Sequence, residues 1–146
     1  MNFAALRNPR ADMAWVAIAG PAINVVLAML AALSFHLLGL VPAGATQWIF
    51  DNLKNALVIN ALLAVFNMFP LPPLDGGRIA VSILPDFLAR PLARLEPYGL
   101  LILIALVILV PLLGNQFGMN VNYASQAISG ATSFLIQMVL LLTGNA

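Results

Sequence analysis

The sequence predicts an all-α membrane protein: a bundle of about four transmembrane helices, one of them broken by a proline-rich stretch. Two observations lead to this fold class. Of the 146 residues, 62% are hydrophobic and only 8% are charged, whereas a soluble domain carries about 25% charged residues. The apolar residues also gather into runs of about 17 residues or more, which is the length needed to cross a bilayer.

These runs divide residues 1–146, which we treat as a single membrane domain, into four predicted helices. Met13–Leu40 carries no charge and is too long for the apolar region of a signal peptide. The other predicted helices are residues 48–69, 97–113 and 127–143. Alanines at helical spacing, Ala28 with Ala32 and Ala127 with Ala131, suit close helix association.

The second predicted helix runs into Pro70-Leu71-Pro72-Pro73-Leu74-Asp75-Gly76-Gly77, where three prolines in four residues cannot continue a helix. Irregular backbone at membrane depth must be buried in protein or line a wet cavity. An ionisable side chain there, Asp75, is by default a functional hypothesis. The alternative is an ordinary turn outside the membrane, because Asp and Gly are common at bends.

The few charges predict an orientation. Arg7 and Arg10 precede the first helix, and Arg78, Arg90 and Arg94 lie between the second and third. Cytoplasmic loops of membrane proteins carry the excess of Lys and Arg. We therefore expect the N-terminus, the connection after Asp75 and the C-terminus to be cytoplasmic. The net charge of +1 gives no sign of a nucleic-acid partner.

The spacing of the broken stretch reads Asn67-x-x-Pro70-x-x-x-Leu74-Asp75-Gly76. It resembles the Asn-x-x-Pro-x-x-x-Leu-Asp-Gly motif of the site-2 protease family of intramembrane zinc metalloproteases. Two upstream elements are also similar to bacterial members: Ala19-Gly20-Pro21-Ala22-Ile23-Asn24, and the lead-in Asn8-Pro9-Arg10-x-Asp12-Met13. The resemblance covers roughly residues 2 to 90.

The resemblance implies a multi-pass zinc metalloendopeptidase of the bacterial cytoplasmic membrane, surrounded by lipid and acting on transmembrane protein substrates. Asp75 would be the third zinc ligand, and a zinc-bound water would attack the peptide carbonyl. Asn67 would hold the substrate or polarise the scissile carbonyl. The structural members of the motifs would be Pro70, which stops the helix, Leu74, and Gly76 and Gly77, which allow a tight bend. Gly20 and Pro21 would serve close helix approach, and Asn24 an interhelical hydrogen bond.

The other half of the family's zinc site, His-Glu-x-x-His, is absent, since the sequence holds one histidine, His36, and one glutamate, Glu96. Helix length places His36 at the opposite membrane face from Asp75, as an interfacial or packing residue. Glu96, immediately before Pro97, suits a helix start. We therefore expect this chain alone neither to hold zinc tightly nor to hydrolyse peptides.

Three explanations for the missing half stay open. The chain is a fragment or begins at a late methionine, which the intact Asp75 motif favours. Alternatively it is one part of a split enzyme whose partner chain carries His-Glu-x-x-His, or a degenerate relative. The alternative function is therefore a non-catalytic membrane subunit that acts by helix–helix interaction. A transporter would show paired broken helices. This sequence has only one predicted broken helix, so we do not expect a transporter.

Overall fold

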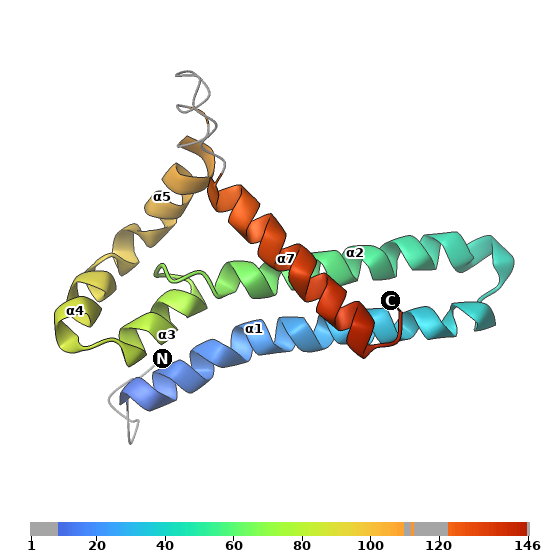
Figure 1. Ribbon diagram of the computed structural model, residues 1–146, viewed down its shortest axis with the longest axis horizontal. Coiled ribbons are helices and arrows are strands. Elements are labelled where there is room, and N and C mark those ends of the chain that lie inside the picture. Colours follow the sequence, from blue (N-terminus) through green and yellow to red (C-terminus); the bar gives the residue numbers. More distant parts are fainter. Residues whose placement is uncertain (1–8, 110–111, 113–122, 146) are drawn as a thin grey trace.

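The computed structural model describes residues 9–109, 112 and 123–145, and these form helices joined by turns (Figure 1). Arg7, used for the predicted orientation, and Asn8, the first residue of the lead-in, lie outside the described residues. The long helices are α1 (Pro9–Ser34), continued by the 3₁₀ helix η2 (Phe35–Leu40), α2 (Ala43–Asn67) and α7 (Tyr123–Leu142). Between α2 and α7 come α3 (Asp75–Ile83), α4 (Asp86–Arg94), the 3₁₀ helix η3 (Glu96–Tyr98), α5 (Gly99–Ile104) and the π-helix η4 (Ala105–Leu109).

The predicted all-α membrane bundle is confirmed. In the described part of the chain, three helices are long and apolar enough to cross a membrane: Asp12–Leu40, Ala43–Asn67 and Ser125–Leu142. They correspond to the first, second and last predicted helices. The remaining predicted helix, residues 97–113, is helical over its described residues 99–109 and then continues into residues that are not described. Three spans, rather than about four, are therefore what the described residues provide.

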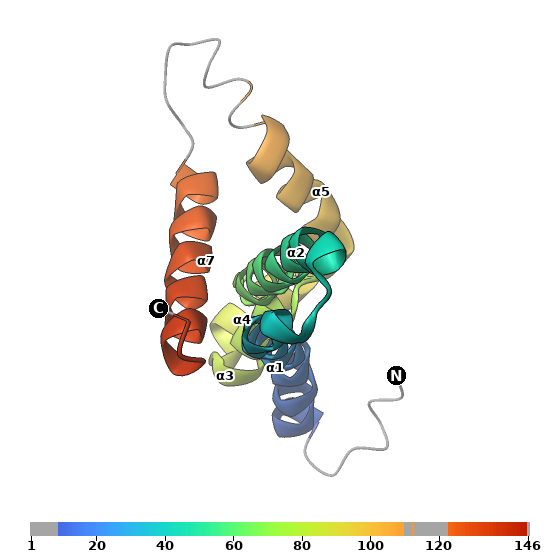
Figure 2. The ribbon, with the colours of Figure 1, turned by 90° about the vertical axis from the view of Figure 1, so that its right-hand side faces the viewer.

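The three long helices pack through small side chains. α1 and α2 form a hairpin, and α7 crosses both of them (Figures 1 and 2). Ala28 and Ala32 of α1 are fully buried against Leu57 of α2 and Val139 of α7. A side chain as small as alanine lets the helix backbones approach closely, which increases dispersion contacts where no hydrophobic drive is available. The predicted packing role of this alanine pair is confirmed.

His36 and the C-terminal residues lie together at one end of the bundle. Nε2 of His36 is 2.7 Å from the carbonyl oxygen of Thr143. The side-chain amide of Asn145 donates to the carbonyl of Ala32 at 2.9 Å. These bonds hold the end of α7 against the end of α1, so His36 has the helix-packing role that the sequence predicts.

α7 runs from the C-terminal end of α2 towards the far end of α1. Its first turns lie beside Met68–Pro70, at the C-terminal end of α2. Its last turn lies beside Ala32 and His36, near the other end of α1. The described C-terminal residues, 143–145, therefore lie beside the end of α1 that is opposite its start, and the membrane side of the two termini stays a prediction.

Replacing Ala32 with Leu should destabilise the bundle by about 1–3 kcal/mol, because the larger side chain must enter a filled interface between helices. Thermal unfolding in detergent measures the change. Ala22→Leu is the matched control, since Ala22 is exposed on the same helix. Equal melting temperatures for the two variants would contradict the packing described for α1.

Candidate functional site

The turn between α2 and α3 is built so that few backbone donors lack a partner. α2 ends at Asn67, and three of the next six residues are prolines, which have no N–H group to satisfy. The N–H of Leu71 donates to the carbonyl of Phe69 at 2.8 Å, and that of Leu74 to the carbonyl of Leu71 at 3.0 Å. The carbonyl of Leu74, the N-cap of α3, accepts from Gly77 at 3.0 Å. Such a turn can exist near membrane depth without water as its partner.

Gly76 and Gly77 allow close packing of the backbone. Both lie in the first turn of α3 and are buried. A Cβ on Gly76 would overlap the backbone carbonyls of Met68 and Phe69, and one on Gly77 would overlap the Leu71–Pro72 peptide. Neither glycine has a positive φ. What the two positions require is the absence of a side chain, because α3 starts directly against the turn that precedes it.

Asp75 is the first residue of α3, and its carboxyl group lies on Gly20 of α1. An ideal Cβ on Gly20 would be 3.3 Å from Cγ of Asp75 and would overlap Oδ2. The side chain of Asp75 therefore occupies the space that any larger residue at position 20 would need. The close neighbour of Gly20 is thus the carboxyl group of Asp75. The two sequence motifs, distant along the chain, meet at this contact.

The two motif asparagines flank the contact without joining it. Asn67 is the last residue of α2, and Asn24 lies one turn beyond Gly20 on α1; both are half-buried. Neither side chain makes a hydrogen bond within the described part of the chain. The interhelical bond of Asn24 and the substrate contact of Asn67 therefore stay predictions.

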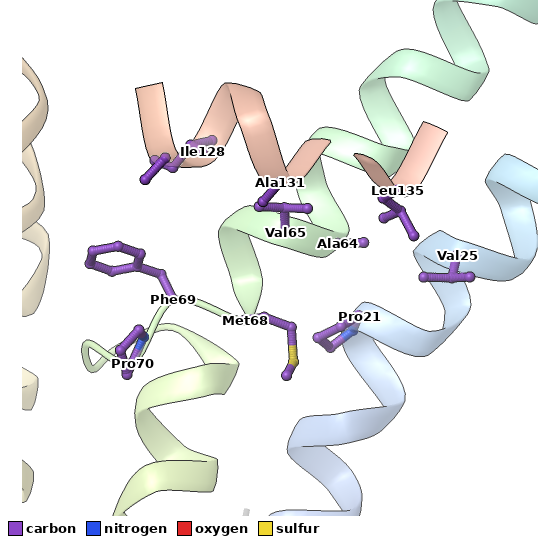
Figure 3. A pocket seen from close by; sticks show the side chains of 11 residues that line it. Pro21, Val25, Ala64, Val65, Met68, Phe69, Pro70, Ile128, Ala131 and Leu135 are labelled. Carbon is purple, nitrogen blue, oxygen red and sulfur yellow. The ribbon is translucent and has the colours of Figure 1, made fainter. Parts of the chain in front are cut away.

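An apolar cavity of about 500 Å³ lies beside this region, between α1, α2 and α7 (Figure 3). Pro21 adjoins Gly20, and Met68 packs under Gly76, so two lining residues are neighbours of the contact made by Asp75. The predicted alanine pair of α7, Ala127 and Ala131, lines the cavity rather than a closed helix interface. The lining residues are Pro21, Val25, Ala64, Val65, Met68, Phe69, Pro70, Ala127, Ile128, Ala131 and Leu135.

Sequence reasoning missed two contacts around α3. Nη2 of Arg78 lies 3.3 Å from Oε1 of Glu96, so the arginine expected to act as a topology anchor is paired with the glutamate expected at a helix start. Gly99, the first residue of α5, is buried against the Pro72 carbonyl and the Pro73 ring. The opposite charges of Arg78 and Glu96 were a weak signal for the first contact. The sequence around Gly99 held no signal for the second.

The residues described do not fit a catalytic zinc ion by themselves. Such an ion usually takes three protein ligands and a water. Within residues 9–109 and 123–145, no three His, Cys, Asp or Glu side chains are grouped to hold a metal. The one histidine, His36, is about 24 Å further along the first helical segment than Gly20, at roughly 1.5 Å per residue. Asp75 by itself is one carboxylate and does not make up such a ligand set.

Comparison with known proteins agrees with the motifs. Residues 41–110 match Peptidase family M50. The chain is 30% identical over 106 residues to a putative zinc metalloprotease, YwhC, of Bacillus subtilis, covering 70% of this chain and 48% of that protein. It is 35% identical over 127 residues to a putative zinc metalloprotease, Rip2, of Mycolicibacterium smegmatis, covering 83% of this chain and 45% of the relative. No solved structure matches.

The apolar helices and these relatives define the class: a membrane protein related to zinc metalloproteases. More particularly, the chain belongs to Peptidase family M50, the site-2 proteases. It spans about half the length of the curated relatives it matches.

Gly77→Ala should destabilise the protein by about 1–3 kcal/mol, because its Cβ would overlap backbone that cannot move as a flexible side chain does. The measurement is the melting temperature in detergent. Gly130→Ala is the control, since Gly130 is helical with open space around it, and should be neutral or stabilising by up to about 1 kcal/mol. A neutral Gly77→Ala would contradict the packing of α3 against the turn.

Proposed function

We propose that this chain supplies the carboxylate ligand, Asp75, to the zinc site of an intramembrane metalloprotease. The two imidazole ligands and the general base would come from a His-Glu-x-x-His helix that these 146 residues do not contain. The observation that carries the proposal is the position of Asp75 at the start of α3, where its carboxyl group packs against Gly20. That contact joins the two sequence elements which resemble the family, and it leaves the carboxylate half-buried without an ion pair among the described residues.

The substrates in this proposal are apolar, membrane-embedded protein segments. The cavity of about 500 Å³ beside Asp75 is lined by apolar side chains, so a polar peptide would lose its hydration there without gaining partners. Asn67, at the end of α2 above the same turn, is the residue we assign to the substrate backbone or the scissile carbonyl.

The orientation that we propose places Asp75, the start of α1 and helices α3 and α4 at the cytoplasmic side. The arginines of the α3–α4 segment, Arg78, Arg90 and Arg94, support this side, because cytoplasmic segments carry the excess of basic residues. The surrounding partner is membrane lipid. A further partner chain is required if His-Glu-x-x-His is not encoded together with these residues.

The chain as given should bind much less than one zinc per molecule, because a single carboxylate ligand does not compete well with the water molecules that hydrate the free ion. The measurement is metal content after purification in detergent with added zinc. Asp75→Ala and, as the control at the other end of α1, His36→Ala should leave this low value unchanged. One zinc per chain, lost in Asp75→Ala, would contradict the claim that the remaining ligands lie elsewhere.

The source of those ligands can be read from coding DNA. An in-frame His-Glu-x-x-His within a hydrophobic run upstream of codon 1, with no stop codon between, supports a single longer polypeptide. A stop codon there supports a split enzyme or a degenerate subunit. In the split case, co-purification of the second chain should raise the zinc content to about one per assembly, and Asp75→Ala should then lower it.

A further inference from the structure

The segment Glu96–Gly99 contacts the polypeptide on both sides of Asp75. On the C-terminal side it reaches Arg78, which lies in α3 one turn after Asp75, through the 3.3 Å contact of Nη2 with Oε1 of Glu96. Both side chains are about half exposed, at 43% and 50%, so the pair is accessible to water. The ion pair therefore contributes little free energy. It does connect α3 to η3, the short helix directly before α5.

On the N-terminal side, the same segment reaches Pro72 and Pro73 through Gly99. A Cβ on Gly99 would overlap the carbonyl of Pro72 and Cδ of Pro73. Pro72 is among the most completely buried side chains of the described residues. This contact is between rigid groups, a proline ring and two stretches of backbone, so it cannot relax as a flexible side chain would.

The two contacts belong to one small assembly. Pro72, Arg78 and Glu96 line a single hollow of about 190 Å³, together with Met13 of α1, Val81 and Ala93. Asp75 lies between Pro72 and Arg78 in the chain. Its helix, α3, has nine residues, and isolated helices shorter than about 12 residues are marginal in water. The position of Asp75 therefore depends on tertiary contacts of this kind.

We propose that Glu96–Gly99 is a positioning brace, which holds Pro72–Pro73 and Arg78 in fixed relation so that the carboxyl group of Asp75 stays on Gly20. Glu96 and Gly99 are positioning residues, and neither touches the carboxylate. The brace also couples α5 to Asp75: a shift of the start of α5 moves both flanks of the aspartate. Its importance for catalysis rests on the proposed role of Asp75 as a zinc ligand.

The chain contains no cysteine, so a cysteine pair reports the Asp75–Gly20 contact without background. In Gly20→Cys/Asp75→Cys, the new Cβ at position 20 is 3.3 Å from the place of Cγ of Asp75, close to what a disulfide requires. The readout is the rate of disulfide formation in membranes under mild oxidation. Adding Glu96→Arg should slow it about 1.5- to 5-fold, the range for one exposed ion pair. Adding Gly99→Ala should slow it about 5- to 100-fold, since an overpacked contact must open.

Charge exchange separates positioning from general damage. Arg78→Glu/Glu96→Arg in the same cysteine background should restore the rate to within about twofold of the parent, because the pair is re-formed with opposite polarity. The matched control is Arg90→Glu, which reverses the charge of an exposed partner in the 3.9 Å pair with Asp86 on α4 and should leave the rate unchanged. Glu96→Gln, a milder change, should slow the reaction in the same direction as Glu96→Arg.

Parental rates in both Glu96→Arg and Gly99→Ala would overturn the brace, as would an equal loss in Arg90→Glu or a charge exchange that fails to restore the rate. The oxidation needs neither metal nor substrate. A failure of the brace therefore appears in the crosslinking rate, whereas a failure of Asp75 as a ligand appears only in the zinc content of the complete assembly.

Discussion

The rest of the site depends on one constraint, which is that glycine stands at three close contacts where a side chain would not fit. Gly76 and Gly77 bring the start of α3 against the turn after α2, and Gly20 leaves room on α1 for the carboxyl group of Asp75. If any of these positions carried a Cβ, the aspartate would have to move. The glycines determine the position of the carboxylate because they have no side chain that would occupy the space around it.

The membrane imposes the second condition on the same turn. A broken helix near hydrocarbon must satisfy its own polar groups. Here the prolines remove donors, and the remaining N–H groups, such as those of Leu71 and Leu74, bond within the turn. The prolines thus have two effects: they end α2 and they lower the number of groups that need partners. That combination lets a charged residue follow directly after a membrane-spanning helix.

Parts of the fold could be predicted from residue patterns because they follow from local rules. Long apolar runs determine α1, α2 and α7, and the Ala28–Ala32 pair determines where α1 can approach its neighbours. Three of the expected spans lie within the described residues, whereas the fourth, residues 97–113, runs into residues that the structure does not describe. The described helix after Glu96 is interrupted by a π-helical turn within eleven residues, Gly99–Leu109.

The sequence by itself determined that this is a helical membrane protein and that Asp75 is its notable carboxylate, because hydrophobicity and motif spacing are properties of the chain alone. It also determined that these residues contain one histidine and no His-Glu-x-x-His. Only the tertiary structure decided that Asp75 lies against Gly20, that the glycine pair after it packs against the preceding turn, and that Glu96 and Gly99 contact both flanks of the aspartate. Those facts depend on distances between segments remote in sequence, which no local pattern encodes.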